Sequence, residues 1–430
     1  MSTVRSRITA ALGASSFGQA TVILMQLAAL PLFLSKWDAS TYGTWLMLTA
    51  VPAYLSIADG GLVLAAANRA TMYVAQGNNQ SAERAFQSAF AFLICASVVV
   101  LSVTAPLILW VGIPGLDSAD TKIALIILVC GILLSQYNGL AECILRACNS
   151  YAQGIMLGNV SRLLEFGGWM IGLFAYGTFT AVAATGILFR AIGLTWTVIA
   201  TRKFNSKIKW GLAQAQYAEC KQLAKSGLMF LAFPLTNALS LQGVTLIVGY
   251  LISPAAVTVF NTYRTLTRFS LQITTALGNS IWAEFSKMYA NADMHALRKL
   301  YKKSYLIGTG VSIIASLAIY FAAPFIIEIW TRGHIDIDRT LLLLMLLAAL
   351  AGGAWNVPRV LMMATNNHGK LVIQSLFGAA MSVLLAYTFA KQFGIHGVAF
   401  SVLTIELVLA AACISSTHRL LSLHNKNTAV

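Results

Sequence analysis

The sequence predicts an all-α, polytopic membrane protein with about twelve transmembrane helices in two six-helix lobes. Three observations support this fold class: long runs without charge, a one-sided distribution of Lys and Arg, and an internal repeat. Hydrophobic residues make up 58% of the chain and charged residues 10%. About 18 apolar residues in a row suffice for a helix that crosses a bilayer. Runs without Asp, Glu, Lys or Arg of that length cover residues 8–35, 85–116, 226–263, 304–327 and 371–390.

The predicted spans follow one another closely along the chain. They cover residues 8–35, 42–67, 85–111, 121–145, 152–175, 179–201, 226–251, 255–283, 304–329, 340–364, 371–391 and 397–417. Pro52, Pro234 and Pro358 fall inside the second, seventh and tenth spans, where we expect kinked or broken helices because proline removes a backbone hydrogen bond. The connections are too short for a soluble catalytic domain, so we do not expect an enzyme.

Lys and Arg collect in the loops on one side of the predicted membrane. The loops on the other side hold only Lys36, Lys122, Arg332, Arg339 and Lys391. Because cytoplasmic loops carry the excess of basic residues, we expect both termini in the cytoplasm. The net charge of +15 follows from this bias. A nucleic-acid partner would need a basic patch in a soluble domain, and the sequence contains no such domain. The basic loops at 202–225 and 287–303 are expected to contact anionic membrane lipids.

Cysteine and histidine positions argue against disulfides and metal sites. All six cysteines fall in predicted spans or on the cytoplasmic side, where thiols stay reduced. The six histidines lack the spacing of metal ligands. Glycine motifs for nucleotide binding are also missing. We therefore expect no metal, no cofactor and no direct ATP hydrolysis.

The two halves of the chain match each other at an offset of 218 residues. This shift aligns Ala105-Pro106 with Ala323-Pro324, Tyr137-Asn138 with Trp355-Asn356, and Asn149 with Asn367. The offset corresponds to one six-helix unit, and an even number of spans gives both copies the same orientation, related by an axis along the membrane normal. We expect an N-terminal lobe at 1–205, a cytoplasmic linker at 206–225 and a C-terminal lobe at 226–430.

Ionisable residues inside the spans are candidates for function, because each costs about 2.5–3.5 kcal/mol on insertion scales. The candidates are Asp59, Glu142, Arg162, Glu165, Arg190, Arg264, Arg268, Arg359 and Glu406. Arg162 and Glu165 are three residues apart, and Glu142 and Arg146 four apart, so each pair can also be a structural ion pair within one helix. Arg190 is expected to extend toward an interface. Glu406 is a lone acid whose role stays open.

Arg264, Arg268 and Arg359 have no acid within one helical turn. Arg264 and Arg268 are four residues apart and share a helix face, and Arg359 follows Pro358. Guanidinium groups bind phosphate through a fork of donors, so we expect these side chains to face water or an anionic ligand. The alternative is neutralisation across the bundle by Asp59, Glu142 or Glu165. Amides such as Asn138 and Asn356 either join helices or suit sugar rings.

Several short motifs resemble bacterial polysaccharide flippases, which include the O-antigen and exopolysaccharide flippases. They are Gly18-Gln19, Pro31, Tyr42-Gly43-Thr44-Trp45, Asp59-Gly60-Gly61 and Asn68-Arg69. That family belongs to the superfamily of multidrug, oligosaccharidyl-lipid and polysaccharide (MOP) exporters. The resemblance implies a protein of the bacterial cytoplasmic membrane that moves a polyprenyl-diphosphate-linked oligosaccharide from the inner to the outer leaflet by alternating access.

The resemblance also implies roles for the candidate residues. Substrate binding is assigned to Arg264, Arg268, Arg359, Arg162, Asn138 and Asn356, and coupling to a proton or sodium gradient to Asp59, Glu142 and Glu165. A polysaccharide polymerase is a candidate partner. The alternative on the same scaffold is a cation-coupled multidrug exporter. A membrane polymerase or ligase is disfavoured, because the outer loop that holds Arg332, His334 and Arg339 is short.

Overall fold

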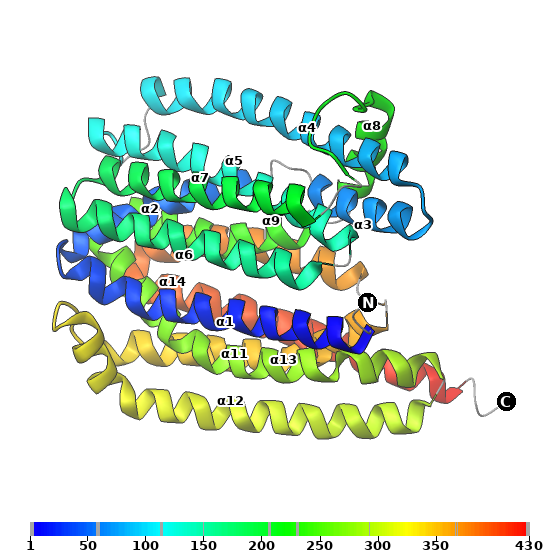
Figure 1. The fold of residues 1–430 in the computed structure, drawn as a ribbon. Coiled ribbons are helices and arrows are strands. Elements are labelled where there is room, and N and C mark those ends of the chain that lie inside the picture. The colour runs from blue at the N-terminus through cyan, green and yellow to red at the C-terminus, as the bar shows by residue number, and fades with distance from the viewer. Residues whose placement is uncertain are drawn as a thin grey trace. The chain divides into compact units, whose positions relative to one another are not determined.

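The chain folds almost entirely into α-helices (Figure 1). The computed structural model describes residues 4–56, 61–111, 115–148, 150–204, 208–228, 232–291, 293–365, 367 and 369–426, and these contain no strand. The chain divides into two compact units, unit 1 at Met1–Leu235 and unit 2 at Thr236–Val430. The predicted all-α class, with two helical units, is confirmed.

Unit 1 holds the first six predicted spans. Its helices are α1 (Val4–Leu34), α2 (Ala39–Leu55), α3 (Leu62–Ala75), α4 (Asn79–Pro106), α5 (Ala119–Ala147), α6 (Tyr151–Ala175), α7 (Phe179–Phe204) and α8 (Tyr217–Leu228), and the π-helical turn η2 (Leu107–Val111) continues α4. The predicted second span, 42–67, is divided between α2 and α3. Asp59 falls between them, outside the described residues.

Unit 2 holds the last six predicted spans, apart from residues 226–235 at the start of the seventh. Its elements are α9 (Ala232–Ala238), in which the boundary between the units falls, η3 (Leu239–Gly243), α10 (Val244–Leu251), α11 (Pro254–Ala290), α12 (Met294–Thr331), α13 (Arg339–Ala364) and α14 (Gly369–Lys426). α14 contains both final spans, separated at Gly394, whose φ of 58° and ψ of −139° are not helical. Glycine adopts such a positive φ without strain.

The helix breaks do not coincide with the prolines. Pro52 lies inside α2 and Pro358 inside α13, and both helices continue through them. The prediction that the helix is broken at Pro358 is therefore wrong. Proline removes one backbone donor only, and neighbouring helices in a packed bundle tolerate this loss. In α13, Thr417 of α14 donates to the carbonyl oxygen of Pro358 across 3.4 Å.

Seven helices of the described residues are long and apolar enough to cross a membrane. One of them, Gly369–Ser422, holds two predicted spans. Every other predicted span also overlaps a helix, although those of the second and seventh spans are divided. The chain is therefore a multi-pass membrane protein.

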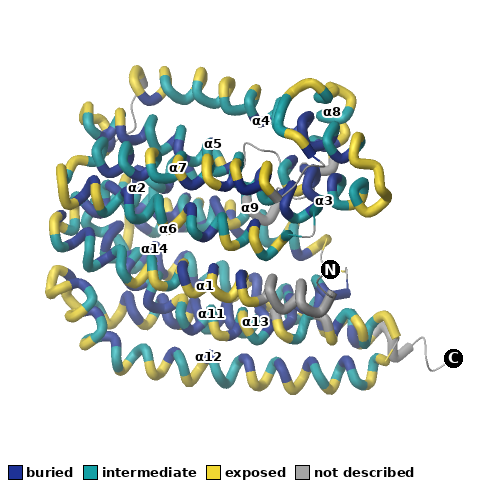
Figure 2. The backbone as a smooth tube through the Cα atoms, viewed as in Figure 1, coloured by how far each residue is buried: buried dark blue, intermediate teal, exposed yellow. Residues whose placement is uncertain are grey.

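Each unit has a central helix and a peripheral one (Figure 2). In unit 2, 61% of the most apolar window of α13 is buried, compared with 22% for α12. In unit 1 the corresponding values are 39% for α5 and 11% for α4. The peripheral helices expose large apolar side chains such as Val99, Val103, Ile314 and Phe321, which suit contact with lipid chains. The central helices therefore form the core of each unit.

A similar side-chain contact occurs once within each unit, at two acids that are 218 residues apart, as the repeat predicts. Asp120, at the start of α5, accepts hydrogen bonds from the backbone N–H groups of Phe179 and Thr180, each at 2.9 Å, where α7 begins. Asp338, at the start of α13, lies 2.7 Å from Nε2 of His396, just after the break in α14. Each acid thus joins the start of the unit's fourth predicted span to the start of its sixth. This repeated contact supports a duplicated six-helix unit.

The segment that the sequence predicts as a linker lies against unit 1. Arg69 of α3 forms an ion pair of 2.7 Å with Glu219 of α8. Gln87 of α4 donates to the carbonyl oxygen of Lys209 at 3.0 Å and accepts from the N–H of Gln214 at 2.7 Å. These contacts place the described part of the segment on α3 and α4.

Candidate functional site

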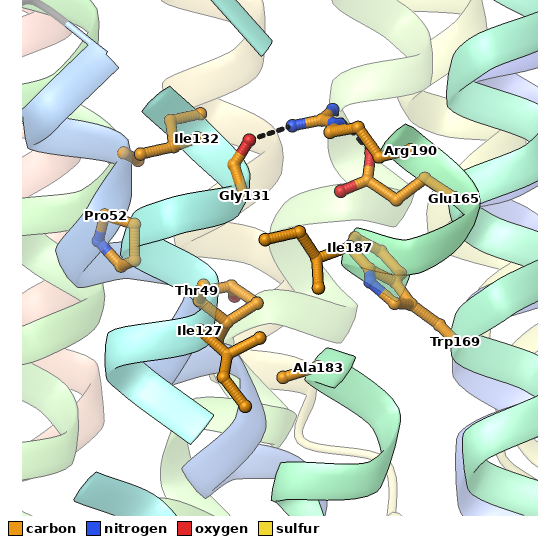
Figure 3. Close-up of a pocket in the computed structure, with 12 residues that line it drawn as sticks. Thr49, Pro52, Ile127, Gly131, Ile132, Glu165, Trp169, Ala183, Ile187 and Arg190 are labelled. Atoms are coloured by element: carbon orange, nitrogen blue, oxygen red, sulfur yellow. Dashed lines mark hydrogen bonds and ion pairs between the residues drawn. The ribbon is translucent and has the colours of Figure 1, made fainter. Parts of the chain in front are cut away.

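Each unit contains a cavity lined by charged side chains from membrane-spanning helices. The unit 1 cavity has a volume of about 180 Å³ and lies among α2, α5, α6 and α7 (Figure 3). Its lining consists of Thr49, Pro52, Ala53, Ile127, Leu128, Gly131, Ile132, Glu165, Trp169, Ala183, Ile187 and Arg190. Apart from one acid and one base, this lining is mostly apolar and includes one indole ring.

Glu165 and Arg190 form an ion pair inside the unit 1 cavity. Oε2 of Glu165 lies 2.5 Å from Nη2 of Arg190, and each side chain is only 14% exposed. Figure 3 shows the two side chains turned toward each other from α6 and α7, with Arg190 also reaching Gly131. Nη1 of Arg190 donates to that carbonyl oxygen across 3.0 Å. Arg190 therefore does not extend to an interface as predicted, because it is held by Glu165.

Trp169 lies against α7 because residue 186 is glycine. A Cβ atom at Gly186 would lie 2.2 Å from two atoms of the indole ring. Real Cβ atoms do not approach that closely, so any other residue would displace the ring from the cavity wall. The local sequence of α7 thus gives the unit 1 cavity a flat aromatic surface beside its ion pair.

The unit 2 cavity brings together two predicted arginines and an acid. It has a volume of about 130 Å³ and lies among η3, α10, α11, α13 and α14. Its lining consists of Ser240, Leu241, Val244, Phe260, Arg264, Thr267, Arg268, Leu271, Met345, Ala348, Ala349, Ser382, Val402, Ile405, Glu406 and Leu409. Arg264 and Arg268 share one face of α11, as their spacing predicts.

Arg264 is fixed by neutral groups. Its Nη1 donates to the carbonyl oxygen of Leu241 at 2.9 Å, and its Nη2 donates to Oγ1 of Thr245 at 3.0 Å and to Oδ1 of Asn261 at 2.8 Å. The guanidinium carbon also lies 5.6 Å from the centre of the Phe260 ring. These contacts orient the side chain, but none of them neutralises its charge.

Arg268 is the exposed base of the unit 2 cavity. Its side chain lines the cavity one turn from Arg264. Within the described part of the chain, neither arginine forms an ion pair with a carboxylate. Arg268 interacts electrostatically with Glu406 at longer range. A guanidinium in this setting is available to an anionic group that enters the cavity.

Glu406 is held by Trp355. The indole Nε1 of Trp355 donates to Oε2 of Glu406 across 2.9 Å. Gly352 leaves room for this carboxylate, since a Cβ there would lie 3.3 Å from the same oxygen. The guanidinium carbon of Arg359 lies 5.4 Å from the centre of the same Trp355 ring. The acid, the indole and this third arginine form one cluster beside the cavity.

Asn356 connects the same cluster to α11. Its Oδ1 accepts from Nη2 of Arg359 at 3.3 Å, and its Nδ2 donates to Oγ1 of Thr275 at 2.9 Å. The predicted residues Arg264, Arg268, Arg359 and Asn356 therefore all lie in or beside one site. Glu406 and Trp355 belong to that site as well, although neither was among the residues that the sequence assigned to substrate binding or coupling. The sequence signals for them were that Glu406 is a lone acid in a span, and that Trp355 is an aromatic residue in a span that aligns with Tyr137 in the repeat.

The remaining predicted residues lie in unit 1. Asn138 donates to Oγ of Ser161 at 3.2 Å and so joins α5 to α6. Arg162 is exposed, and it interacts electrostatically with Glu142 together with Arg146. These residues, like Glu165, do not line the unit 2 cavity. Asp59 lies outside the described residues, so its assigned coupling role stays a prediction.

Potential metal ligands are not gathered in the described part of the chain, which contains no cluster of three or more His, Cys, Asp or Glu that could hold an ion. The six cysteines are free thiols.

Comparisons with known proteins give matches in fold. No protein-family model matches the sequence, and no curated protein matches it either. Among solved structures, the inward-facing conformation of a multidrug resistance MATE family transporter of the MOP superfamily has a TM-score of 0.79, with 14% identity over 94% of this chain and 96% of that one.

Two further structures show the same fold. An outward-facing conformation of a multidrug resistance MATE family transporter has a TM-score of 0.65, with 14% identity over 98% of this chain and 96% of that one. A MOP superfamily transporter from Pyrococcus furiosus, described as having a binding pocket of reversed polarity, has a TM-score of 0.66 and 14% identity, with the same coverage. This chain therefore has the fold of MOP superfamily transporters.

Proposed function

We propose that this protein is a flippase that moves a polyprenyl-diphosphate-linked oligosaccharide from the inner to the outer leaflet of a bacterial cytoplasmic membrane. The observation that carries the proposal is the composition of the unit 2 site. In the described part of the chain, Arg264, Arg268 and Arg359 lie in or beside a cavity whose lining contains one acid, Glu406. The site therefore has an excess of positive charge among membrane-spanning helices.

The excess of positive charge at the unit 2 site favours an anionic ligand. Charges in a membrane interior are costly unless they are compensated, and a diphosphate diester supplies two negative charges and several acceptor oxygens. A cavity of about 130 Å³ is roughly ten times the space of about 10–15 Å³ that one water molecule needs in the same measure, so a compact anionic group fits in it. The cavity would take the diphosphate and leave the glycan and the lipid chain outside it.

The fold is compatible with a positively charged binding pocket. The Pyrococcus furiosus transporter of the same superfamily is described as having a pocket of reversed polarity and a different function. Transporters of this fold have also been observed inward-facing and outward-facing. We infer that this chain likewise works by alternating access, coupled to a proton or sodium gradient. Both termini would then lie in the cytoplasm, and a polysaccharide polymerase would be a natural partner.

The proposal is tested by a flipping assay in sealed vesicles. Arg268→Ala removes the exposed guanidinium of the unit 2 cavity, and we expect it to slow transfer of a fluorescent isoprenyl-diphosphate-linked sugar by at least tenfold. The matched control is Arg339→Ala, which removes an exposed arginine that does not line the cavity. Equal rates for wild type and Arg268→Ala, at equal amounts of folded protein, would refute the assigned role.

A second candidate function is cation-coupled multidrug export. The observation that favours it is the unit 1 cavity, where Glu165 and the Trp169 ring lie within a mostly apolar lining. Carboxylates and aromatic faces attract organic cations, and two solved structures of this fold are described as multidrug resistance transporters. Arg190 neutralises Glu165, however, which weakens this cavity as a cation site. The same vesicles loaded with a cationic dye distinguish the two functions.

A further inference from the structure

Among the residues that the structure describes, Glu406 is the one carboxylate that lines the unit 2 cavity. Arg264 and Arg268 line the cavity from α11. Arg359, on α13, lies against the ring of Trp355. Glu406 interacts electrostatically with Arg268 and Arg359. Its negative charge therefore occupies the region to which an incoming phosphate would be drawn.

The position of this carboxylate is built into the fold. The Trp355 indole fixes one oxygen at 2.9 Å, and Gly352 provides the space beside it. Arg268, in contrast, has no carboxylate within ion-pair distance among the described residues. Glu406 is thus held near the exposed guanidinium without forming a contact ion pair with it. A ligand anion can therefore bind Arg268 without breaking a direct bond.

We propose that Glu406 is a built-in counter-anion of the unit 2 cavity, which lowers the affinity for the substrate diphosphate so that the substrate can leave. When the cavity is empty, the carboxylate offsets part of the positive charge and so stabilises the unloaded protein. When a diphosphate enters, like charges repel, and binding is weaker than three arginines alone would give. A transporter needs this balance, because a ligand that binds too tightly is not released.

This inference rests on the proposed function, and it assigns Glu406 a role in affinity that the flippase activity alone does not require. The test variant is Glu406→Gln, which removes the charge and keeps an oxygen that can accept from Trp355. We expect this variant to bind a short-chain isoprenyl-diphosphate-linked sugar about tenfold more tightly than wild type, and to flip it several-fold more slowly. A tenfold gain corresponds to about 1.4 kcal/mol. A merely structural role for Glu406 would weaken binding and transport together.

Two further variants show whether the gain depends on the cluster. In Glu406→Gln with Arg268→Ala, the gain should disappear, because the guanidinium that benefits from the missing charge is gone. Trp355→Phe keeps the charge of Glu406 but releases the carboxylate, so we expect a smaller gain of about two- to fourfold. Glu328→Gln makes the same change at an exposed glutamate that does not line the cavity, so it is the control and should leave affinity unchanged.

The possible outcomes separate this inference from the proposed function. Affinity is measured by isothermal titration on detergent-solubilised, monodisperse protein. If wild type binds the lipid-linked diphosphate but neither Glu406→Gln nor Trp355→Phe binds more tightly, the counter-anion role is overturned and the flippase proposal stands. If wild type does not bind the diphosphate lipid at all, both proposals fail. Tighter binding with slower flipping, lost in the double variant, supports the inference.

Discussion

Glu165 shows that a buried acid takes its partner from a neighbouring helix as readily as from its own. Helix spacing allowed a pair with Arg162, three residues before it, but Arg162 is exposed. The partner is Arg190 on α7, at 2.5 Å. α6 and α7 pack along their length, so the fold brings this base to the acid. Sequence spacing alone could not identify it.

At the residue scale, we predict that Arg190→Ala destabilises unit 1. The substitution leaves Glu165 without a base, and loss of one partner of a buried pair costs about 3–5 kcal/mol. We expect a clear drop in the melting temperature of the detergent-solubilised protein. In Arg190→Met with Glu165→Met both charges are replaced by apolar side chains of similar length, and stability should return toward the wild-type value. An unchanged melting temperature for Arg190→Ala would show that the pair is not buried.

The arginines of the unit 2 site were predictable because of what surrounds them in the sequence. Arg264 and Arg268 lie in a span without a nearby acid, and the structure places both in a cavity. Their acid, Glu406, lies on α14, and its holder, Trp355, lies on α13. Such a cluster depends on tertiary packing. The sequence therefore indicated the arginines but not that the charge of Glu406 offsets part of theirs.

At the element scale, glycines determine how closely α6 and α7 approach. A Cβ at Gly172 would lie 2.4 Å from Oγ1 of Thr185 and 2.7 Å from the carbonyl oxygen of Ala181. Gly168 is similarly close to the α7 backbone. Small residues allow helices in membranes to pack backbone to backbone. This close contact also holds the face of α7 that carries Arg190 next to Glu165.

We predict that Gly172→Ala destabilises the contact between α6 and α7. The added methyl group has no space, and overpacking typically costs about 1–3 kcal/mol. Gly167→Ala on the same helix is the matched control, because nothing lies within 4 Å of its Cβ position. Its stability should stay equal or rise slightly, since alanine favours helix more than glycine does. Thermal melts of both variants check this, and equal melting temperatures would contradict the packing described for Gly172.

Helix existence was easier to predict than helix continuity. Long apolar runs gave the spans, because few other structures satisfy backbone groups in a membrane. The breaks were harder to predict. α13 continues through Pro358, whereas the chain changes direction at Gly394 and begins α3 after Gly61, which has a φ of 68°. Whether a proline interrupts a helix depends on its neighbours in space, which the sequence does not show.

At the scale of the whole molecule, the internal repeat was the most informative property of the sequence. It predicted two helical units, and the contacts at Asp120 and Asp338 appear at the same offset. The charges, however, are not repeated. Unit 1 has a closed ion pair in its cavity, whereas unit 2 has arginines in excess over one acid. We infer that the duplicated units have diverged, with unit 2 specialised for an anionic ligand.

The central claim is that the transported substrate is a lipid-linked diphosphate glycan. It is tested most directly by mass spectrometry of lipid extracts from a strain that lacks this protein and any redundant flippase. The account predicts that polyprenyl-diphosphate oligosaccharide accumulates and surface polysaccharide is lost. It also predicts that wild type restores both and Arg268→Ala does not. Normal surface polysaccharide without accumulated lipid-linked glycan would contradict the claim, and sensitivity to cationic dyes in that strain would favour multidrug export instead.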